Sequence, residues 1–348
     1  MKLVQIRSFV KGGNHGQFLQ ALGLANLLEK LLPNHKITHL NYENHFFKEL
    51  KIQIRSGMLP KFLMMRYYWN KYLKFSSINN KTDLSVYGSD MIWHLDSKLF
   101  SPDPILFGKN DNSKHKISYA PSTGYRIQPE PSWIKKYLND FNNISVRDYT
   151  TANFVKDHSS IKPNLAIDPC FHLINSKFSK WFINIEKQNF LSVYSPQPEI
   201  FLNAFNQNLD FKKLPSWIKN YIYLGYFPRS RLLQDLPKQL YDPLWTLKKI
   251  SQSKLLITTT FHGVMMALMT KTPFIAVTNP NLSARLDSPI AETFSKKRLI
   301  TIEEFKELTS SKLLKFFSEQ DIDELKIKKY LISSESWIKS SLIESKII

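Results

Sequence analysis

The segment TTTFHGVMMALMTKTPFIAV, residues 258–277, carries a histidine followed directly by a glycine. The run KLLITT that leads into it predicts a strand, and VMMALMTK predicts a helix. His262 would then lie at the carboxyl end of a strand and at a helix N-terminus, where it could bind an anion or shuttle a proton. Gly263 would let the backbone approach a ligand closely. A lone histidine is usually structural, so this segment leaves packing and chemistry both open.

The first turn of the chain is rich in glycine and amide side chains. It reads SFVKGGNHGQFLQALGL and follows the apolar run KLVQIR. Its glycine spacing differs from the dinucleotide-binding and P-loop fingerprints, so a nucleotide motif is absent. The helix that begins near Gly16 offers free N–H groups to an anion, and Asn14, His15 and Gln20 would bind sugar or phosphate. The alternative is a solvated turn without a ligand.

Two later turns place a carboxylate and hydroxyl groups at strand ends. In VYGSDMIWH, Ser89 and Asp90 directly follow an apolar strand. A carboxylate at such a place is either a helix cap or a catalytic base. In ISYAPSTGY, Ser122 and Thr123 come just before a glycine at the end of the next predicted strand. We treat these side chains as candidate substrate-binding or catalytic groups.

Arg147 ends the predicted strand in ISVRDYTTANFV, and Asp148 would begin the following helix. A guanidinium at a strand end can bind a carboxylate or phosphate through two N–H groups. The alternative is an ion pair with Asp148 or Asp168. Because no HxH, HExxH or CxxC spacing occurs, the sequence predicts no metal site.

Strands and helices must position these turns, and short β-branched runs alternate with helical patterns along the whole chain. This alternation predicts an α/β fold with parallel sheets and helices on both faces. A gap near residues 174–188 divides the runs into two Rossmann-like halves, which we place at residues 1–178 and 179–348. The C-terminal stretch, about residues 321–346, predicts one or two helices that cross back onto the first half. The predicted strands are residues 2–7, 36–42, 83–88, 116–121, 143–148, 164–168, 190–195, 221–226, 254–259, 273–277 and 298–302.

The net charge of +19 predicts an anionic partner, such as nucleic acid, an acidic membrane surface or a phosphate-bearing substrate. The single cysteine, Cys170, excludes an internal disulfide and fits the cytoplasm, and neither a signal peptide nor a membrane span is recognisable. Residues 50–82 contain seven Lys or Arg and no acid. Their aromatic part, residues 58–75, would lie on a membrane or on single-stranded nucleic acid, or would pack as an ordinary helix.

Taken together, the polar turns resemble the polysaccharide pyruvyl transferase family. The matching segments occur in family order and span about residues 1–278: NHGQFLQALGL, VYGSDMIWH, ISYAPSTG, ISVRDYTTA, AIDPCFHL and TTTFHGVMMALMTKTPFIAV. The resemblance implies a GT-B-like fold, with the sheets of two Rossmann-like domains facing a central cleft. It also implies transfer of a pyruvyl group from phosphoenolpyruvate onto two hydroxyls of a sugar, forming a ketal without a metal or cofactor. The acceptor implied is a surface-polysaccharide or lipid-linked glycan precursor.

The resemblance also implies roles for single residues. The family histidine matches His262, but the arginine two positions before it is Thr260 here. Arg285, in NLSARLDS, would replace that arginine in holding the donor. His262 would donate a proton or hold the phosphate, Arg147 would hold an anion, and Asp90 would take a hydroxyl proton.

Two other functions compete with pyruvyl transfer. The lost arginine favours a GT-B glycosyltransferase that uses a nucleotide-sugar donor, and the charge alone favours a non-enzymatic binder of nucleic acid or membrane. Six ordered matches favour the pyruvyl transferase, for which we expect no nucleic-acid partner. We expect it in the cytoplasm, held at the inner membrane face by the basic segment. The membrane contacts would be made by Leu63, Met64, Tyr68 and Trp69, with Lys61, Arg66, Lys71 and Lys74 attracting anionic lipid.

Overall fold

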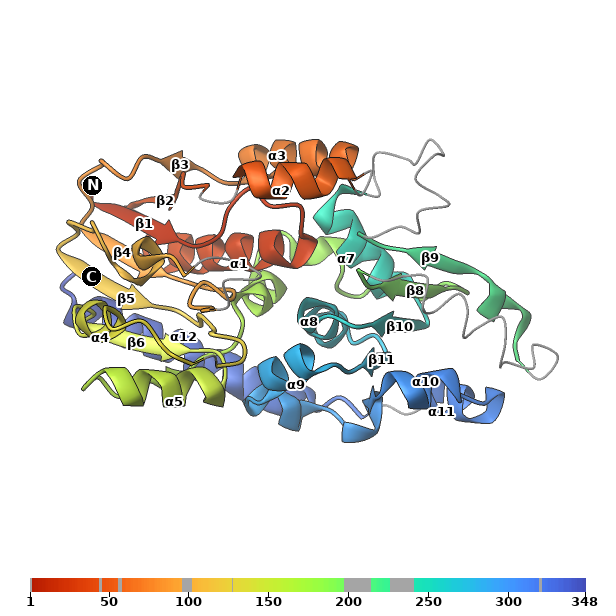
Figure 1. Ribbon diagram of the computed structural model, residues 1–348. Helices are drawn as coiled ribbons and strands as arrows, with labels where there is room; N and C mark the ends of the chain where they lie inside the picture. Colours follow the sequence, from red (N-terminus) through yellow and green to blue (C-terminus); the bar gives the residue numbers. More distant parts are fainter. Residues whose placement is uncertain are drawn as a thin grey trace.

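The computed structural model describes residues 2–43, 46–55, 58–95, 102–126, 128–196, 214–225, 241–318 and 321–348. These residues form two α/β domains, each built on a parallel sheet with helices packed against it (Figure 1). The prediction of two Rossmann-like domains with parallel sheets is therefore confirmed.

The first sheet has seven strands in the order β3-β2-β1-β4-β5-β6-β7. The chain moves outward from β1 to β3, then returns to the other side of β1 and continues from β4 to β7. The strand order thus reverses between β1 and β4, where open α/β sheets bind ligands at the carboxyl ends of the strands. The strands are β1 (Leu3–Arg7), β2 (Lys36–Leu40), β3 (Phe75–Ser76), β4 (Leu84–Tyr87), β5 (His115–Ser118), β6 (Asn143–Val146) and β7 (Asn164–Leu165).

The second sheet has five parallel strands in the order β12-β11-β10-β8-β9. Its order reverses between β8 and β10, and the register pairs Tyr194 with Thr258, the last residue of each strand. The loops that follow these two strands therefore leave the sheet side by side. The strands are β8 (Leu191–Tyr194), β9 (Tyr221–Tyr223), β10 (Leu255–Thr258), β11 (Phe274–Val277) and β12 (Leu299–Ile300).

Helix α1 (His15–Leu31) lies between the two domains. Asn14 caps it by accepting from the backbone N–H of Gly16 at 2.8 Å, and Pro33 follows its end. Helix α1 packs against the 3₁₀ helix η2 (Pro169–Asn175) and against α7 and α8 of the second domain. Because it has neighbours on several sides, most of its apolar residues are buried, among them residues 18, 21, 22, 25 and 28.

The other helices cover the sheets and connect the strands (Figure 1). They are α2 (Phe46–Arg55), α3 (Leu59–Tyr72), α4 (Ile134–Leu138), α5 (Tyr149–His158), α7 (Pro243–Gln252), α8 (Phe261–Met269), α9 (Pro280–Leu286), α10 (Ile302–Lys306), α11 (Ser310–Ser318) and α12 (Glu324–Glu344). Helix α12 contacts the first domain: Ser334 Oγ accepts from the backbone N–H of Ile167 at 2.9 Å, and Asn143 donates to Glu344 at 2.8 Å. The last helix thereby ties the two domains together.

The aromatic face of α3 packs into the core of the first domain. Trp69 is fully buried and its indole N–H donates to the carbonyl of Gly12 at 3.0 Å, while Tyr68 and Lys61 are also buried. The predicted membrane insertion by Tyr68 and Trp69, and the attraction of lipid by Lys61, are therefore wrong. The helix uses Tyr68 and Trp69 for packing, whereas Tyr67 is exposed, and of the predicted apolar contacts Leu63 remains exposed.

Candidate active site

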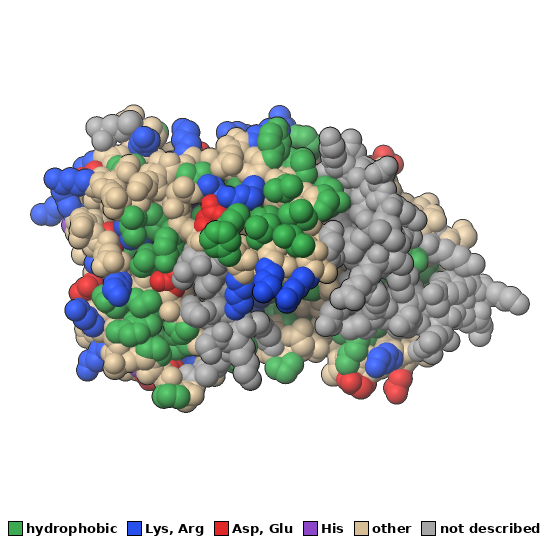
Figure 2. Space-filling model, turned by 45° about the horizontal axis from the view of Figure 1, so that its top comes forward, with side chains coloured by type: hydrophobic (Ala, Val, Ile, Leu, Met, Phe, Trp, Pro, Cys, Tyr) green, Lys and Arg blue, Asp and Glu red, His purple; other side chains and the backbone are tan. Residues whose placement is uncertain are grey.

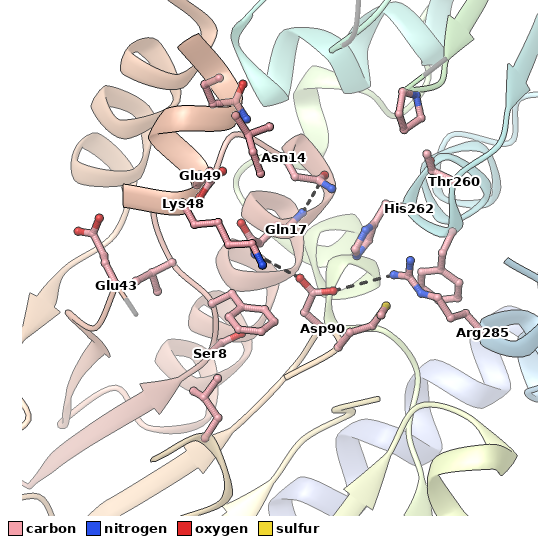
Figure 3. Close-up of a pocket in the computed structure, with 18 of the residues that line it drawn as sticks. Ser8, Asn14, Gln17, Glu43, Lys48, Glu49, Asp90, Thr260, His262 and Arg285 are labelled. Atoms are coloured by element: carbon pink, nitrogen blue, oxygen red, sulfur yellow. Dashed lines mark hydrogen bonds and ion pairs between the residues drawn. The ribbon is translucent and has the colours of Figure 1, made fainter. Parts of the chain in front are cut away.

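A cavity of about 650 Å³ lies at the switch points of both sheets. Figure 3 shows its wall, with Asn14 and Asp90 from the first domain opposite Thr260, His262 and Arg285 from the second. Asn14 follows β1 and Asp90 follows β4, whereas Thr260 and His262 follow β10. Of the five strand-end turns that carried the predicted chemistry, those after β1, β4 and β10 therefore converge at the cavity from two domains.

His262 is the second residue of α8 and is 5% exposed. Thr260 caps the helix, because its Oγ1 accepts from the backbone N–H of Gly263 at 3.0 Å. The earlier N–H groups of a helix have no intrahelical acceptor, so this end of α8 favours an anion. Thr260, His262 and the helix terminus thus form one wall of the cavity.

Gly16 at the start of α1 makes room for the His262 ring. A Cβ added at Gly16 would lie 2.2 Å from His262 Cγ and 2.3 Å from His262 Cβ. Carbon atoms in contact lie about 3.5–4.0 Å apart, so no larger residue fits here without movement. The role of Gly16 is therefore close packing of the two domains, which places the imidazole over the first turn of α1.

Asp168 anchors the buried charges behind the cavity. Its Oδ2 accepts from Arg147 Nη1 at 2.9 Å and lies 3.8 Å from His262 Nε2, and the side chain is fully buried. Burial alone would raise the pKa of Asp168, but His262, Arg147 and the Cys170 N–H together lower it below its usual value. Asp168 is therefore ionised, and it neutralises Arg147.

The phenyl ring of Phe261 joins two guanidinium groups. The Cζ atom of Arg147 lies 4.1 Å from the ring centroid and that of Arg285 lies 4.8 Å from it. Arg285 lines the cavity and its Nη2 is 3.9 Å from Asp90 Oδ1. Burial, and then the neighbouring Arg147, lower the pKa of Arg285 to about 10, so it still carries its charge at neutral pH.

His262 is neutral at neutral pH in this unliganded site. Burial lowers its pKa to about 4, against the opposing influence of Asp168 and Asp90. Its Nε2 has no hydrogen-bond partner among the described residues. An anion in the cavity would favour the imidazolium and raise this pKa, so ligand binding and protonation of His262 are coupled.

Asp90 faces the cavity from the first domain. Its backbone has a φ of 76°, a left-handed conformation that is unusual for a residue other than glycine. Its Oδ2 accepts from Gln17 Nε2 at 3.3 Å, and no helix begins at this residue. Of the two roles the sequence left open, the helix cap is therefore not what the structure shows, and the carboxylate is available to a ligand.

Several other candidate residues lie in the buried layer beneath the cavity. His15 is fully buried, and its Nδ1 is 2.9 Å from Thr246 Oγ1 of the second domain. Gln20 accepts from the hydroxyl of Ser89 in the same layer. These three side chains, with Ser122 and Thr123, fix the loops and do not line the cavity wall.

Ser122, Thr123 and Arg147 belong to the framework of the strand ends. Ser122 donates to Asp148 Oδ2 at 2.6 Å, and the Thr123 backbone N–H donates to Thr151 Oγ1 at 2.9 Å. Arg147 takes the ion pair with Asp168 that the sequence offered as the alternative to ligand binding. Its Nε and Nη2 have no hydrogen-bond partner among the described residues. Arg147 therefore acts on the cavity through Phe261 and through its charge.

Sequence reasoning missed Gln17, Phe261, Asp168 and Glu49 as site residues. Gln17 lies one helical turn after the cap Asn14, and this spacing could have singled it out over Gln20. Asp168 follows a predicted strand, as Asp90 does, and was considered only as an ion-pair partner. Glu49 lines the cavity from α2, far along the chain, and nothing in its local sequence points to it.

Glu49 is the acid on the α2 wall of the cavity. Its Oε1 accepts from the backbone N–H of Gly13 at 2.9 Å. Burial raises the pKa of Glu49, opposed by the Gly13 N–H and by nearby cations. Among the residues that the structure describes, no group of three or more His, Cys, Asp or Glu side chains could hold a metal ion. The site as described is one of cations, amides and single carboxylates.

Comparison with known proteins agrees with this geometry. The chain resembles the UDP-GlcNAc 2-epimerase from Neisseria meningitidis at 10% identity, with a TM-score of 0.51 over 99% of this chain and 100% of that chain. It is also similar to the heptosyltransferase WaaC of E. coli with ADP, at 14% identity and a TM-score of 0.43 over 91% and 99% of the two chains. No curated protein matches the sequence. At such identities the likeness concerns the fold alone, which is GT-B-like.

The family is shown by sequence. Residues 14–281 match the family model for polysaccharide pyruvyl transferase. This span begins at the cap of helix α1, includes Asp90, Asp168 and helix α8 with His262, and ends just inside α9. The span covers well over half of the chain. The chain therefore belongs to the polysaccharide pyruvyl transferase family.

Proposed function

We propose that this protein transfers a pyruvyl group from phosphoenolpyruvate to two hydroxyls of one sugar in a surface-polysaccharide or lipid-linked glycan precursor. The observation that carries the proposal is the meeting of His262, Arg285 and Asp90 at one cavity in a chain of this family. A cationic wall and a carboxylate face each other there, as a reaction between an anionic donor and a hydroxyl requires.

The cationic wall suits the donor. Phosphoenolpyruvate carries a carboxylate and a phosphate, and both are anions that a helix N-terminus and a guanidinium bind well. Thr260 stands where the family has an arginine, and the guanidinium of Arg285 reaches the same wall from α9. Arg285 would then supply the positive charge that Thr260 does not, and Arg147 would add to the field from behind Phe261.

In the proposed reaction, His262 would deliver the first proton. Because the bound donor is strongly anionic, it would raise the low pKa of His262 and bring a proton onto the ring. Transfer of that proton to the donor's CH₂ carbon makes a methyl group and leaves the central carbon electrophilic. This role needs the imidazole close to the donor, and the tight contact of His262 with Gly16 fixes the ring at the cavity.

In the proposed reaction, Asp90 would accept protons from the acceptor. The first sugar hydroxyl forms a C–O bond to the central carbon and gives up its proton, and the bond from that carbon to the phosphate oxygen then breaks. The second hydroxyl forms the other C–O bond and loses its proton. The two hydroxyls lose one proton each, and the new methyl group and the released phosphate gain one proton each, so the reaction balances. Asp90 would take a hydroxyl proton, and Gln17 would hold its carboxylate in place.

The test combines donor binding with product analysis. Phosphoenolpyruvate should raise the melting temperature of the protein, since only ligands of the native state stabilise it. A panel of glycosides with neighbouring free hydroxyls is then incubated with donor and protein, and products are analysed by mass spectrometry. We expect a gain of one pyruvic acid less one water, together with release of phosphate. Donor binding without any such product from matched sugar panels, or no donor binding, would contradict the proposal.

One observation favours a second candidate, a glycosyltransferase with a nucleotide-sugar donor. Thr260 is neutral at the position of the family arginine, so the donor of this chain could differ. The same melting experiment with UDP-, ADP- and dTDP-sugars separates the two functions. Stabilisation by a nucleotide sugar and not by phosphoenolpyruvate would establish the second candidate.

A further inference from the structure

Helix α2 is amphipathic, yet none of its residues is buried. Phe47 is 81% exposed and Ile54 is 57% exposed, although large apolar side chains are normally packed. Helix α3 packs beside α2 and adds Leu63 and Tyr67, which are 56% and 55% exposed. Figure 2 shows hydrophobic and basic side chains gathered on the side of the molecule that carries these helices. Exposed apolar side chains gathered on one side of a protein are typical of interaction surfaces.

The charged residues of the two helices are segregated. Four cations are exposed on these helices or just after them: Lys51 and Arg55 on α2, Lys71 on α3, and Lys74 two residues beyond α3. The acids nearby are used elsewhere, because Glu49 accepts from Gly13 at the cavity and Glu43 pairs with Arg66. The outer surface formed by Phe47, Lys51, Ile54, Arg55, Leu63, Tyr67, Lys71 and Lys74, here called the α2/α3 face, therefore combines apolar and basic side chains without an acid.

We propose that the α2/α3 face docks on an anionic phospholipid bilayer. Basic side chains bind the negative surface of the lipid, and the apolar side chains enter the boundary between headgroups and acyl chains. Ile54 and Leu63 favour lipid over single-stranded nucleic acid, because aliphatic side chains insert into a bilayer but offer no flat ring on which bases stack. No helix among the described residues is long and apolar enough to cross a membrane, so the contact is peripheral.

The position of α2 links this surface to the active site. Phe46, Glu49 and Gln53 of the same helix line the cavity, so one side of α2 faces the substrate and the other faces outward. A bilayer bound to the α2/α3 face would lie beside the cavity wall. On the proposed function, and only on it, acceptors carried at a lipid surface would then reach the cavity without leaving the membrane.

The test is flotation of the whole protein with vesicles, in the absence of donor and acceptor. One set of vesicles is phosphatidylcholine alone and the other contains phosphatidylglycerol. We expect binding to the anionic vesicles only, and weaker binding as salt rises. A charge variant, Lys51→Gln with Arg55→Gln, Lys71→Gln and Lys74→Gln, should lower the partition coefficient about fivefold for each cation removed.

A separate apolar variant carries Phe47→Ser, Ile54→Ser and Leu63→Ser, and it should lower binding at every salt concentration. All of these side chains are exposed and none lines the cavity, so the fold and donor binding should be unchanged.

Matched controls come from the exposed side of other helices. The charge control carries Lys312→Gln, Lys328→Gln, Lys329→Gln and Lys339→Gln, and the apolar control carries Leu325→Ser, Ile332→Ser and Ile343→Ser. Both should bind vesicles as the parent does. The proposal would be overturned if variants and controls lost binding equally, if the protein bound neutral and anionic vesicles equally, or if it bound neither.

Two further measurements keep the outcomes apart. If the charge variant loses affinity for a single-stranded oligonucleotide while vesicle binding is absent, the face binds nucleic acid and the proposal is overturned. The melting shift caused by phosphoenolpyruvate is measured on the same variants. A persistent donor shift without vesicle binding rejects the docking surface alone, and vesicle binding without a donor shift rejects the proposed function alone.

Discussion

Replacing Gly16 by alanine moves His262 without altering the imidazole itself. The added Cβ would lie 2.2 Å from His262 Cγ, 2.3 Å from its Cβ and 2.5 Å from its Nδ1. Contacting carbons need about 3.5–4.0 Å, so the two groups must separate by roughly 1 Å or more. Helices α1 and α8 are both packed in the core, and neither can shift freely. The ring of His262 is therefore expected to leave its position.

The expected effects on stability and on activity differ widely. Overpacking of this kind costs about 1–3 kcal/mol, and Ala in place of Gly inside a helix returns about 0.5–1 kcal/mol. The free energy of unfolding should thus fall by no more than roughly 2.5 kcal/mol. A displacement of about 1 Å at a reacting group costs about 100-fold in rate. Activity should fall far more than stability.

The assay is phosphate release from phosphoenolpyruvate with an acceptor found in the sugar panel, beside urea unfolding of the same samples. Gly13→Ala is the matched control, because its added Cβ would meet no atom closer than 3.5 Å. The control should keep parental activity and stability. A Gly16→Ala variant with parental turnover would refute the reasoning.

If Gly16→Ala fails to fold, a double variant still decides. His262→Gly removes both the ring and the Cβ that the alanine meets, so Gly16→Ala should cost nothing further in that background. A further loss of stability in the double variant, measured by urea unfolding, would show that Gly16 acts by another route.

Three other outcomes follow from the same geometry. Arg285→Met should raise the dissociation constant for phosphoenolpyruvate about 10–150-fold, the equivalent of about 1.5–3 kcal/mol, and calorimetry that finds no change would exclude Arg285 from donor binding. Asp168→Asn should lower the free energy of unfolding by about 3–5 kcal/mol, because it leaves Arg147 buried without its carboxylate. Adding Arg147→Met should restore part of the lost stability, and strictly additive losses in urea unfolding would contradict the pairing. Burial holds the pKa of His262 at about 4, below the unfolded value, so the unfolded chain binds the extra proton and stability should fall as pH drops from about 6.5 to about 4. His262→Gln should reduce that slope by up to about 1.4 kcal/mol per pH unit, and an unchanged slope would refute the shift.

The fold was predictable because all but one of the described strands carry a local signal. Each of the eleven predicted runs overlaps a strand, which is generally shorter at the carboxyl end, since the last residues turn out of the sheet to form the loops. The additional strand β3 (Phe75–Ser76) has two residues and exists only because it pairs with His39 and Leu40 of β2. So short a strand leaves no periodic pattern in the sequence.

The sequence predicted several of the loops that form the cavity, but not which of their side chains line it and which are buried beneath it. His262, Thr260, Asp90 and Arg285 were expected and line the cavity. A strand-end position does not reveal which neighbouring side chain points outward, and Gln17 rather than Gln20 faces the cavity because of the helical rotation of α1. The acid on the α2 wall could not be found at all, because only the packing of distant segments brings it there.

The same limit explains the segment rich in cations and aromatic residues. Trp69 and Tyr68 read as surface groups beside lysines, yet a helix with two faces sends one set of side chains inward and the other outward. When both faces of a helix carry apolar residues, sequence composition does not show which face is buried. The structure separates them, with the aromatic face in the core and the exposed apolar side chains on α2 and the outer face of α3.

The buried charges around the cavity together favour the binding of an anion. Among the described residues at the site, Asp168 neutralises Arg147, but Arg285 meets Asp90 at 3.9 Å, which is too long for a tight pair. Two guanidinium groups held beside one phenyl ring repel each other, and burial with Arg147 nearby accordingly lowers the pKa of Arg285 to about 10. Because His262 is neutral, it does not add a third positive charge to the site. An anionic donor reverses each of these effects: it would pair with Arg285 and draw a proton onto His262. On the proposed function, binding of the anionic donor would itself protonate the acid that the first step requires.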